Sequence, residues 1–557
     1  MSIKNYKVRI KEINIENFKC FQGTFNLILN EGLNILVGDN EVGKSTILEA
    51  MHLALTGIFN GKYLRNELTQ YLFNNKVVEA YIKSLEEKGA TIPMPPHIVI
   101  EIFIGGDEDM ALLEGDQNSK KTRASGISLK IAFNEKYKPE YESLIKSGGI
   151  KTIPIEYYDI IWTSFARDTI TAKSIPLKSA LIDSSSYRYR SGSDVYISQI
   201  IRDFLDIEDI VAISQAHRKL KESFMGDPSI GIINTKIKNA TNISDKEVKV
   251  SVDLSSKNAW ENSLMTYLDD VPFHYIGKGE QTIVKTKLSL SHKKSKEANI
   301  LLLEEPENHL SHSKLNQLIG ELKHGNQEKQ VVVSTHSSFV ANKLGLGSII
   351  LLHDQKTTKF DELSVETKAF FEKLSGYDTL RLLLCKKAIL VEGDSDELIV
   401  QKAYMSENNK KIPIEDNVDV ISVGTSFLRF LEIAKKIKKP VIVVTDNDGD
   451  VDAVRQKYAE YLGEKSATKD FIRICFDETV ETGGLKIGDK PFNYNTLEPK
   501  MVKANSTEKL NSILGTDHKT IDDLHRYMKA HKTDCALRIF DADEEINFPD
   551  YILDAIK

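Results

Sequence analysis

Short apolar runs alternate with amphipathic stretches along this chain and predict buried strands joined by helices. The opening segment alternates apolar and polar residues from Val8 to Phe18, which is typical of a half-buried strand. A continuous apolar run at 33–37 is followed by a glycine turn and a helix start at 45–50. Further strand-like runs occur at 98–104, 300–303, 331–334, 388–391, 418–422 and 441–445. Strands that alternate with helical segments predict an α/β fold with a mainly parallel sheet.

Changes in this pattern predict the domain organisation. A chain of 557 residues is long enough for two to four domains of roughly 100–200 residues each. We expect a first domain in two parts, interrupted by a mostly helical insertion and followed by a charged linker and a second domain. The predicted bounds are 1–163 and 226–353 for the first domain, 164–225 for the insertion, 354–383 for the linker and 384–557 for the second domain.

Composition excludes several classes of protein. Hydrophobic residues make up 41% of the chain and charged residues 28%, as in globular proteins, and no apolar run reaches the ~18 residues of a membrane span. The N-terminus lacks a signal-peptide core, and the four cysteines lie far apart without zinc-site spacing, so we expect a cytoplasmic protein with reduced thiols and no membrane partner. Because the net charge is −7, nucleic acid would be held by a local patch or through metal ions.

Residues 38–45 (GDNEVGKS) fit the phosphate-binding pattern G-x-x-x-x-G-K-[ST] between a predicted strand and a helix. Glycines let backbone N–H groups converge on phosphate, and the helix N-terminus favours negative charge. Lys44 would reach the β and γ phosphates, and Ser45 would ligate Mg²⁺. The predicted nucleotide ligands in this loop are Gly38, Asn40, Gly43, Lys44, Ser45 and Thr46.

Two later strands end in polar residues that suit ATP hydrolysis. The run at 300–303 ends in Glu304, which suits the magnesium shell, and Glu305, which suits activation of the attacking water. The run at 331–333 leads to Ser334, Thr335 and His336, and this histidine resembles the switch histidine of ABC-type ATPases, which contacts the γ-phosphate.

Residues 276–281 (IGKGEQ) resemble the ABC signature loop, although they depart from its Ser-Gly-Gly form. The resemblance implies that Gly277 and Gly279 contact nucleotide bound to a second head, and hence a homodimer or a higher even-numbered assembly. The interval between Lys44 and Gly277 has no heptads and no room for long coiled-coil arms, which argues against a cohesin-like ATPase.

A second set of acidic residues follows two strands of the second domain. Glu392 and Asp396 lie in the sequence EGDSD, and Asp446 and Asp448 lie in DNDGD after another apolar run. Because the carboxyl ends of neighbouring parallel strands meet, these carboxylates could converge, and they would repel one another unless cations neutralised them. Hard oxygen ligands select Mg²⁺ or Mn²⁺ over zinc.

This acidic pair of motifs is similar to the Toprim signature. A Toprim domain behind an ABC-type head resembles the OLD (overcoming lysogenisation defect) family of ATP-dependent nucleases, which includes Gabija-type and retron-associated anti-phage nucleases. The resemblance implies that Glu498 is a further metal ligand and that Lys532 faces the scissile phosphate. It implies ATP and a divalent cation as cofactors, DNA as substrate, and a partner protein or RNA of a defence system.

We therefore expect a nucleotide-regulated, metal-dependent DNA endonuclease. Two other functions stay open: a DNA-repair or structural ATPase with an inactive Toprim domain, and a Toprim topoisomerase or primase. The intact set of acids argues against the first. The lack of a zinc module or a tyrosine cleavage domain argues against the second.

Overall fold

The computed structural model of the chain consists of two compact units, which are described separately. The first comprises Met1–Leu36, Glu41–Thr335 and Asp354–Lys356, and the second comprises Val37–Asn40, His336–His353 and Thr357–Lys557. The structure describes residues 8–86, 92–106, 110–183, 189–190, 193–194, 205–240, 250, 266–291, 297–325, 328–373, 379–463 and 466–557. Within these residues, no helix combines the length and apolar character needed to cross a membrane.

The first unit contains an antiparallel sheet in the order β2-β1-β6-β8-β7, with β9 paired to β8. Apolar side chains stand opposite each other across its central pair, Ile13 beside Ile102 and Ile15 beside Ile100, and all four are fully buried. The strands are β1 (Val8–Glu16), β2 (Thr24–Ile28), β6 (Ile98–Gly106), β7 (Glu114–Gly115), β8 (Ala124–Phe133) and β9 (Tyr158–Ser164).

Parallel pairing joins four further strands in the order β10-β15-β16-β3. They are β3 (Leu33–Gly38), β10 (Ser179–Asp183), β15 (Ile300–Glu304) and β16 (Gln330–Ser334). Leu302 stands between Leu181 and Val332 in register, and the apolar residues of β15 and β16 are almost entirely buried, as the continuous apolar runs predict. The helices that follow these strands or precede them in the chain are α1 (Lys44–Thr56), α8 (Lys278–Ser291) and α10 (His312–Gly325).

The predicted helical insertion at 164–225 differs from the structure at both ends. Its first part contains β10, which belongs to the parallel sheet because its apolar residues pair with β15. Among the described residues, the helical part of this segment comprises α6 (Ile207–Met225) and continues beyond the predicted end into α7 (Pro228–Ala240). Residues 184–188, 191–192 and 195–204 of the predicted insertion lie outside the described residues.

Smaller elements complete the described part of this first unit. They are β4 (Ile58–Phe59), β5 (Lys62–Tyr63), α2 (Leu64–Glu67), α3 (Asn75–Glu86), α4 (Lys138–Ser147), β11 (Tyr189–Arg190), β12 (Ser193–Asp194), β13 (Tyr267–Leu268) and β14 (Val271–Pro272).

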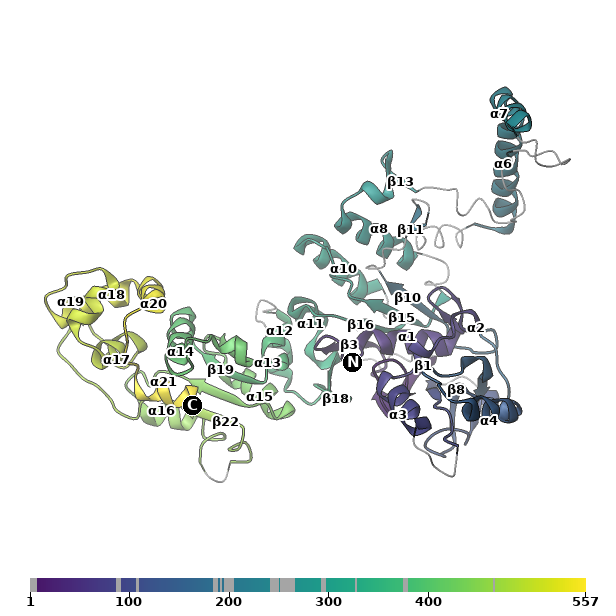
Figure 1. The fold of residues 1–557 in the computed structure, drawn as a ribbon. Coiled ribbons are helices and arrows are strands. Elements are labelled where there is room, and N and C mark those ends of the chain that lie inside the picture. The colour runs from purple at the N-terminus through teal and green to yellow at the C-terminus, as the bar shows by residue number, and fades with distance from the viewer. Residues whose placement is uncertain are drawn as a thin grey trace. The chain divides into compact units, whose positions relative to one another are not determined.

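The second unit is built on a parallel sheet in the order β20-β19-β21-β22. Figure 1 draws this part of the chain in green to yellow and labels β19 and β22 of the sheet. Its strands are β19 (Lys387–Val391), β20 (Val418–Ser422), β21 (Val441–Val444) and β22 (Ile472–Cys475). Helices α20 (Lys532–Asp541) and α21 (Asp550–Ile556) both pack against α14 (Asp394–Glu407). The three helices share a core with the sheet, in which Ile389, Val400 and Ile552 are fully buried. The other helices and the hairpin are α15 (Phe427–Ile437), α16 (Val451–Lys457), β23 (Lys486–Ile487), β24 (Lys490–Pro491), α17 (Leu497–Ala504), α18 (Thr507–Leu514) and α19 (Ile521–Ala530).

The segment predicted as a linker, 354–383, is largely folded where it is described. It contains β18 (Lys356–Lys359), α12 (Val365–Lys373) and most of α13 (Thr379–Leu384), and follows α11 (Ser338–Leu344) and β17 (Ile349–His353). Its charges misled the prediction because some of them form internal contacts. The guanidinium of Arg381 pairs with Asp419 on β20, with Nη2 2.6 Å from Oδ1 and Nε 3.0 Å from Oδ2.

Candidate functional site

The phosphate-binding sequence lies in the connection between β3, which ends at Gly38, and α1, which begins at Lys44. Gly43 precedes α1 with a φ of 102°, and a Cβ atom at this position would lie 2.5 Å from the Phe21 ring and 2.7 Å from Cys20 Sγ. Only glycine fits this close and left-handed turn. Lys44 is 5% exposed at the first position of α1, so the helix N-terminus and a cation are presented together, as phosphate binding requires.

The two carboxylates after β15 lie at the same sheet edge as the end of β3. Glu304 pairs in register with Ser334 on β16, and Ser334 pairs with Leu36 on β3. Glu305 turns away from the strand with a φ of 39°, and its backbone N–H donates to the carbonyl of Ser334 over 3.0 Å. One carboxylate oxygen of Glu305 accepts a hydrogen bond of 2.8 Å from Asn308 Nδ2, which orients it.

The signature-like residues lie at the start of α8. Gly277 is exposed just before the helix, and Gly279 stands so close to the backbone of His309 that a Cβ atom would lie 2.3 Å from its carbonyl oxygen. Gly279 therefore allows α8 to approach the segment that follows Glu305. His336 is exposed and directly follows Thr335. The backbone N–H of Thr335 donates a hydrogen bond of 3.2 Å to the carbonyl of Leu36 on β3.

In the second unit, four predicted acids come from the ends of two adjacent strands. β19 and β21 pair in parallel, with Leu390 opposite Val443. Glu392 follows β19, Asp396 lies in the first turn of α14, and Asp446 and Asp448 follow β21. Glu498 comes from α17, much later in the chain, and is 5% exposed.

Mutual repulsion among these carboxylates shows that they share one region. Burial raises the pKa of Asp396 to about 6, and the charges of Glu498 and Glu392 add to this shift. Burial likewise raises the pKa of Asp446 well above its usual range, with further contributions from the acids listed here: Asp396, Glu498, Glu392 and Asp448. Such a cluster is costly without a cation, because each ionised carboxylate disfavours ionisation of the next.

Protein donors occupy part of this cluster. Asp396 Oδ2 accepts from the backbone N–H of Gly393 over 3.1 Å, and Asp446 Oδ2 accepts from that of Leu497 over 3.1 Å. Glu498 forms an ion pair of 3.0 Å with Lys532 Nζ, and Asp448 accepts from Asn493 over 3.0 Å. Within the described residues, no three acidic, histidine or cysteine side chains already stand as ligands of a single ion. The donor set nevertheless fits hard divalent cations, since it is made of carboxylates, and a cation would lower the raised pKa values of Asp396 and Asp446.

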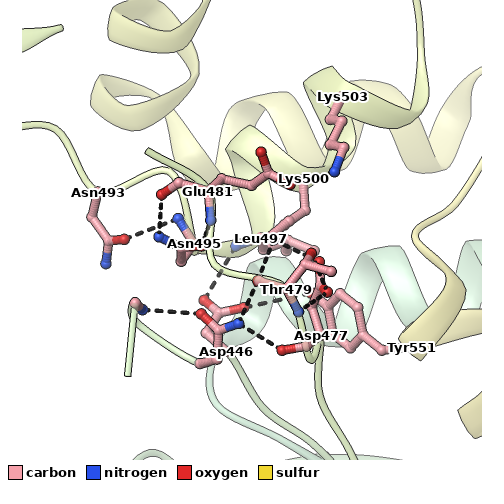
Figure 2. Close-up of polar contacts among 12 residues, drawn as sticks. Asp446, Asp477, Thr479, Glu481, Asn493, Asn495, Leu497, Lys500, Lys503 and Tyr551 are labelled. Carbon is pink, nitrogen blue, oxygen red and sulfur yellow. Dashed lines mark hydrogen bonds and ion pairs between the residues drawn. The ribbon is translucent and has the colours of Figure 1, made fainter. Parts of the chain in front are cut away.

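Sequence reasoning missed the polar residues that surround this cluster. Asn447, between the two predicted ligands, is 2% exposed, and the buried Tyr551 on α21 has its hydroxyl 3.5 Å from Asp446 Oδ1 (Figure 2). Lys500 on α17 is 4% exposed and pairs with Asp477. The sequence alone does not distinguish Lys500, a buried lysine two positions after Glu498, from an exposed lysine on a helix surface.

The fold and these two sites define a nucleotide-binding ATPase head followed by an acidic domain with a parallel sheet. Residues 9–358 match the RecF/RecN/SMC N terminal domain, and the chain belongs to this family. Residues 383–448 match the TOPRIM domain of overcoming lysogenization defect protein-like proteins. The chain thus combines an ABC-type ATPase head with an OLD-like Toprim domain, in agreement with the predicted fold class. None of the curated proteins matches the chain.

Several solved structures align with the chain at low identity. The SMC head domain from Thermotoga maritima aligns at 13% identity and a TM-score of 0.27, covering 62% of this chain and 94% of its own. An Smc head domain derived from Pyrococcus furiosus, bound to the C-terminal domain of ScpA, aligns at 12% and 0.30, covering 66% and 99%. The recombination mediator protein RecF with ATP aligns at 12% and 0.31, covering 64% and 100%.

Proposed function

We propose that this chain is a nucleotide-regulated, divalent-metal-dependent DNA endonuclease of the OLD type. Five carboxylates lie at and beside the carboxyl ends of β19 and β21, and this convergence carries the proposal. Its sign is that burial and neighbouring carboxylates raise the pKa values of Asp396 and Asp446. An acidic cluster that is unfavourable by itself is what a site for two cations requires. The OLD-like Toprim match over the same strands agrees with it.

The proposed roles follow from position. Glu392, Asp396, Asp446, Asp448 and Glu498 would hold divalent cations, Mg²⁺ or Mn²⁺, which supply an activated water and stabilise the leaving oxygen of an in-line displacement. Lys532 would stabilise charge on the scissile phosphate once Glu498, its present partner at 3.0 Å, turns to a cation. In the ATPase head, Lys44 and Ser45 would hold the phosphates and Mg²⁺, Glu304 would join the magnesium shell, and Glu305 would activate water.

The test is plasmid cleavage by the purified chain with Mg²⁺ or Mn²⁺, with and without ATP. We expect nicking or linearisation that Asp446→Ala abolishes while nucleotide binding is unchanged. Cleavage by Asp446→Ala at the wild-type rate would overturn the proposal. Relaxed topoisomers would favour a Toprim topoisomerase, and an absence of any DNA product would favour an ATPase with an inactive Toprim domain.

We further propose that the chain works as a homodimer or a higher even-numbered assembly held partly by α6. This helix buries none of its own residues within the described chain, yet Ile207 is 81% exposed and Leu220 is 69% exposed. Ile213, His217, Leu220 and Phe224 recur at the three- and four-residue spacing of a helix-pairing seam. A second copy of α6 is our proposed cover for this face.

The biological setting that we propose is anti-phage defence. Similarity to Gabija-type and retron-associated nucleases supports a cytoplasmic role in anti-phage defence, with a partner protein or RNA as regulator. That similarity rests on the phosphate-binding loop at 38–45 and on the Toprim-like acids Glu392, Asp396, Asp446 and Asp448.

A further inference from the structure

The turn that carries Asp446 and Asp448 is backbone-strained and depends on the residue between them. Asp448 has a φ of 46° and Gly449 a φ of 86°, so two successive residues adopt left-handed conformations. Aspartate pays a steric cost for this conformation, which persists only where the surroundings hold it. Contacts from neighbouring residues must therefore hold this turn.

The Asn447 side chain forms hydrogen bonds both within this turn and to a loop elsewhere in the chain. Its Oδ1 accepts from the backbone N–H of Gly449 over 3.0 Å. Its Nδ2 donates to two carbonyl oxygens, that of Asp477 over 2.6 Å and that of Thr479 over 2.9 Å. At 2% exposure, the Asn447 amide is the contact through which the turn is tied to the loop after β22.

That loop is itself held by a buried ion pair from α17. Lys500 Nζ lies 2.5 Å from Asp477 Oδ2 and donates to the Thr479 carbonyl over 3.3 Å. The Lys500 side chain is 4% exposed. Although burial opposes ionisation of Asp477, the ion pair with Lys500 and the hydrogen bonds from Thr479 lower the pKa of its carboxyl.

The same helix approaches the site directly at its other end. The backbone N–H of Leu497 donates to Asp446 Oδ2, and Glu498 is the next residue (Figure 2). Lys500 therefore closes a ring of contacts that runs from Asp446 to α17, from α17 to the 477–479 loop, and from that loop to Asn447. Removal of Lys500 or Asn447 would open this ring and weaken the hold on the turn, leaving Asp446 its hydrogen bond from Leu497 and Asp448 its hydrogen bond from Asn493.

We propose that the Lys500–Asp477 ion pair and Asn447 are positioning groups that preorganise the Toprim acids for cations. The inference rests on the proposed metal-dependent function, because it assigns a purpose to the arrangement of those acids. Groups that orient metal ligands without touching the metal typically change metal affinity by about 10- to 100-fold when removed. None of the three side chains needs to contact a cation or DNA in this role.

The experiment measures Mn²⁺ binding by the electron paramagnetic resonance of free Mn²⁺, in the full chain without nucleotide or DNA. We expect Lys500→Met and Asn447→Ala each to weaken Mn²⁺ binding by about 10- to 100-fold. Both substitutions act on one ring of contacts. The double variant Lys500→Met/Asn447→Ala should therefore bind Mn²⁺ only slightly more weakly than whichever single variant binds it more weakly. The matched control is Lys503→Met on the same helix, whose partner Glu481 and own side chain are far more exposed, at 34% and 59%; it should bind as wild type.

Thermal melting under the same conditions identifies variants that fail to fold. Wild-type Mn²⁺ affinity in folded Lys500→Met and Asn447→Ala would overturn the inference, and if Lys500→Met does not fold, Asn447→Ala alone decides. Fully additive losses in the double variant would also overturn it. If the wild type binds Mn²⁺, Asp446→Ala does not, and no DNA is cut, then the proposed nuclease function fails while the positioning inference stands.

Discussion

At the scale of single residues, the second site is governed by charge crowding. Asp396 and Asp446 have raised pKa values because burial and neighbouring carboxylates both disfavour their ionised forms. Partial compensation comes from the backbone N–H groups of Gly393 and Leu497 and from Lys532. The unfavourable electrostatic free energy of these crowded carboxylates would be reduced by a bound divalent cation.

This crowding predicts a pH dependence of stability without metal. Burial, together with the charges of Glu498 and Glu392, raises the pKa of Asp396 from 3.8 to about 6 in the folded protein, so between these pH values the folded state binds more protons than the unfolded state. Its contribution to the free energy of unfolding should consequently fall as pH rises from ~4 to ~6 and stay low above that. We expect the melting temperature of wild type, relative to Asp396→Asn, to decrease over this window in chelator.

Divalent metal should reverse that trend. Because the carboxylate must lose its proton to bind a cation, Mn²⁺ affinity should rise with pH through the same window. A melting-temperature difference between wild type and Asp396→Asn that is constant from ~pH 4 to ~pH 7 would contradict the shifted titration.

At the scale of elements, the start of α1 depends on a glycine that packs against the β1–β2 connection. Gly43 combines a φ of 102° with close contacts to Phe21 and Cys20. Gly320, in the middle of α10, has open space where a Cβ atom would stand and no left-handed backbone. The two positions therefore predict opposite effects of the same substitution.

We expect Gly43→Ala to lower the free energy of unfolding by at least ~1–2 kcal/mol and to weaken nucleotide binding strongly. Gly320→Ala should instead raise the free energy of unfolding by ~0.5–1 kcal/mol, since alanine loses less backbone freedom in a helix. Denaturant unfolding and binding of a fluorescent nucleotide analogue measure both effects. Wild-type nucleotide affinity in Gly43→Ala would show that the loop tolerates a side chain there.

At the scale of the whole molecule, two chemistries occupy separate parts of the sequence. The phosphate-binding loop and Glu305 lie within residues 9–358, which match the RecF/RecN/SMC family, whereas the acids lie in and beyond the Toprim match at 383–448. Mutation should therefore separate ATP hydrolysis from DNA cleavage at the level of chemistry.

Glu305→Gln tests this separation in the head. Glutamine keeps an acceptor for Asn308 but removes the carboxylate, so nucleotide binding should persist while turnover falls by ~10²-fold or more. Glu321→Gln on α10, whose ion pair with Lys287 is exposed, is the control and should hydrolyse ATP normally. Full ATPase activity in Glu305→Gln would exclude it as the group that activates water.

Assembly is the second property of the whole molecule that can be tested. If α6 pairs with another copy of itself, Leu220→Glu should place two carboxylates in an apolar seam and shift light-scattering mass toward the monomer. Lys219→Glu changes the neighbouring exposed position and should leave the mass unchanged. A wild-type chain that is strictly monomeric with and without ATP would refute the dimer.

Much of the fold was predictable from sequence because its strands are continuous apolar runs. The runs at 300–303, 388–391 and 418–422 are strands of parallel sheets. The acids that follow the first two, Glu304 and Glu392, could be placed at strand ends from pairing rules alone. Less predictable were β10, inside the expected helical insertion, and the helices of the expected linker. The secondary structure of these short apolar segments depends on the elements that pack against them, which the local sequence does not specify.

By itself, the sequence determined that Glu392 follows β19 and that Asp446 and Asp448 follow β21, because each acid comes directly after its apolar run in the chain. Glu498 was expected from the family resemblance rather than from local order, and the structure brings its charge near that of Asp446. Only the tertiary structure decided that Asn447, Asp477 and Lys500 contact one another beside these acids. These residues act through contacts between segments some 23 to 51 positions apart, such as Lys500 with Asp477 and Leu497 with Asp446. The physical reason is that a lysine or asparagine changes from an ordinary surface residue to a buried structural one solely through what folds against it.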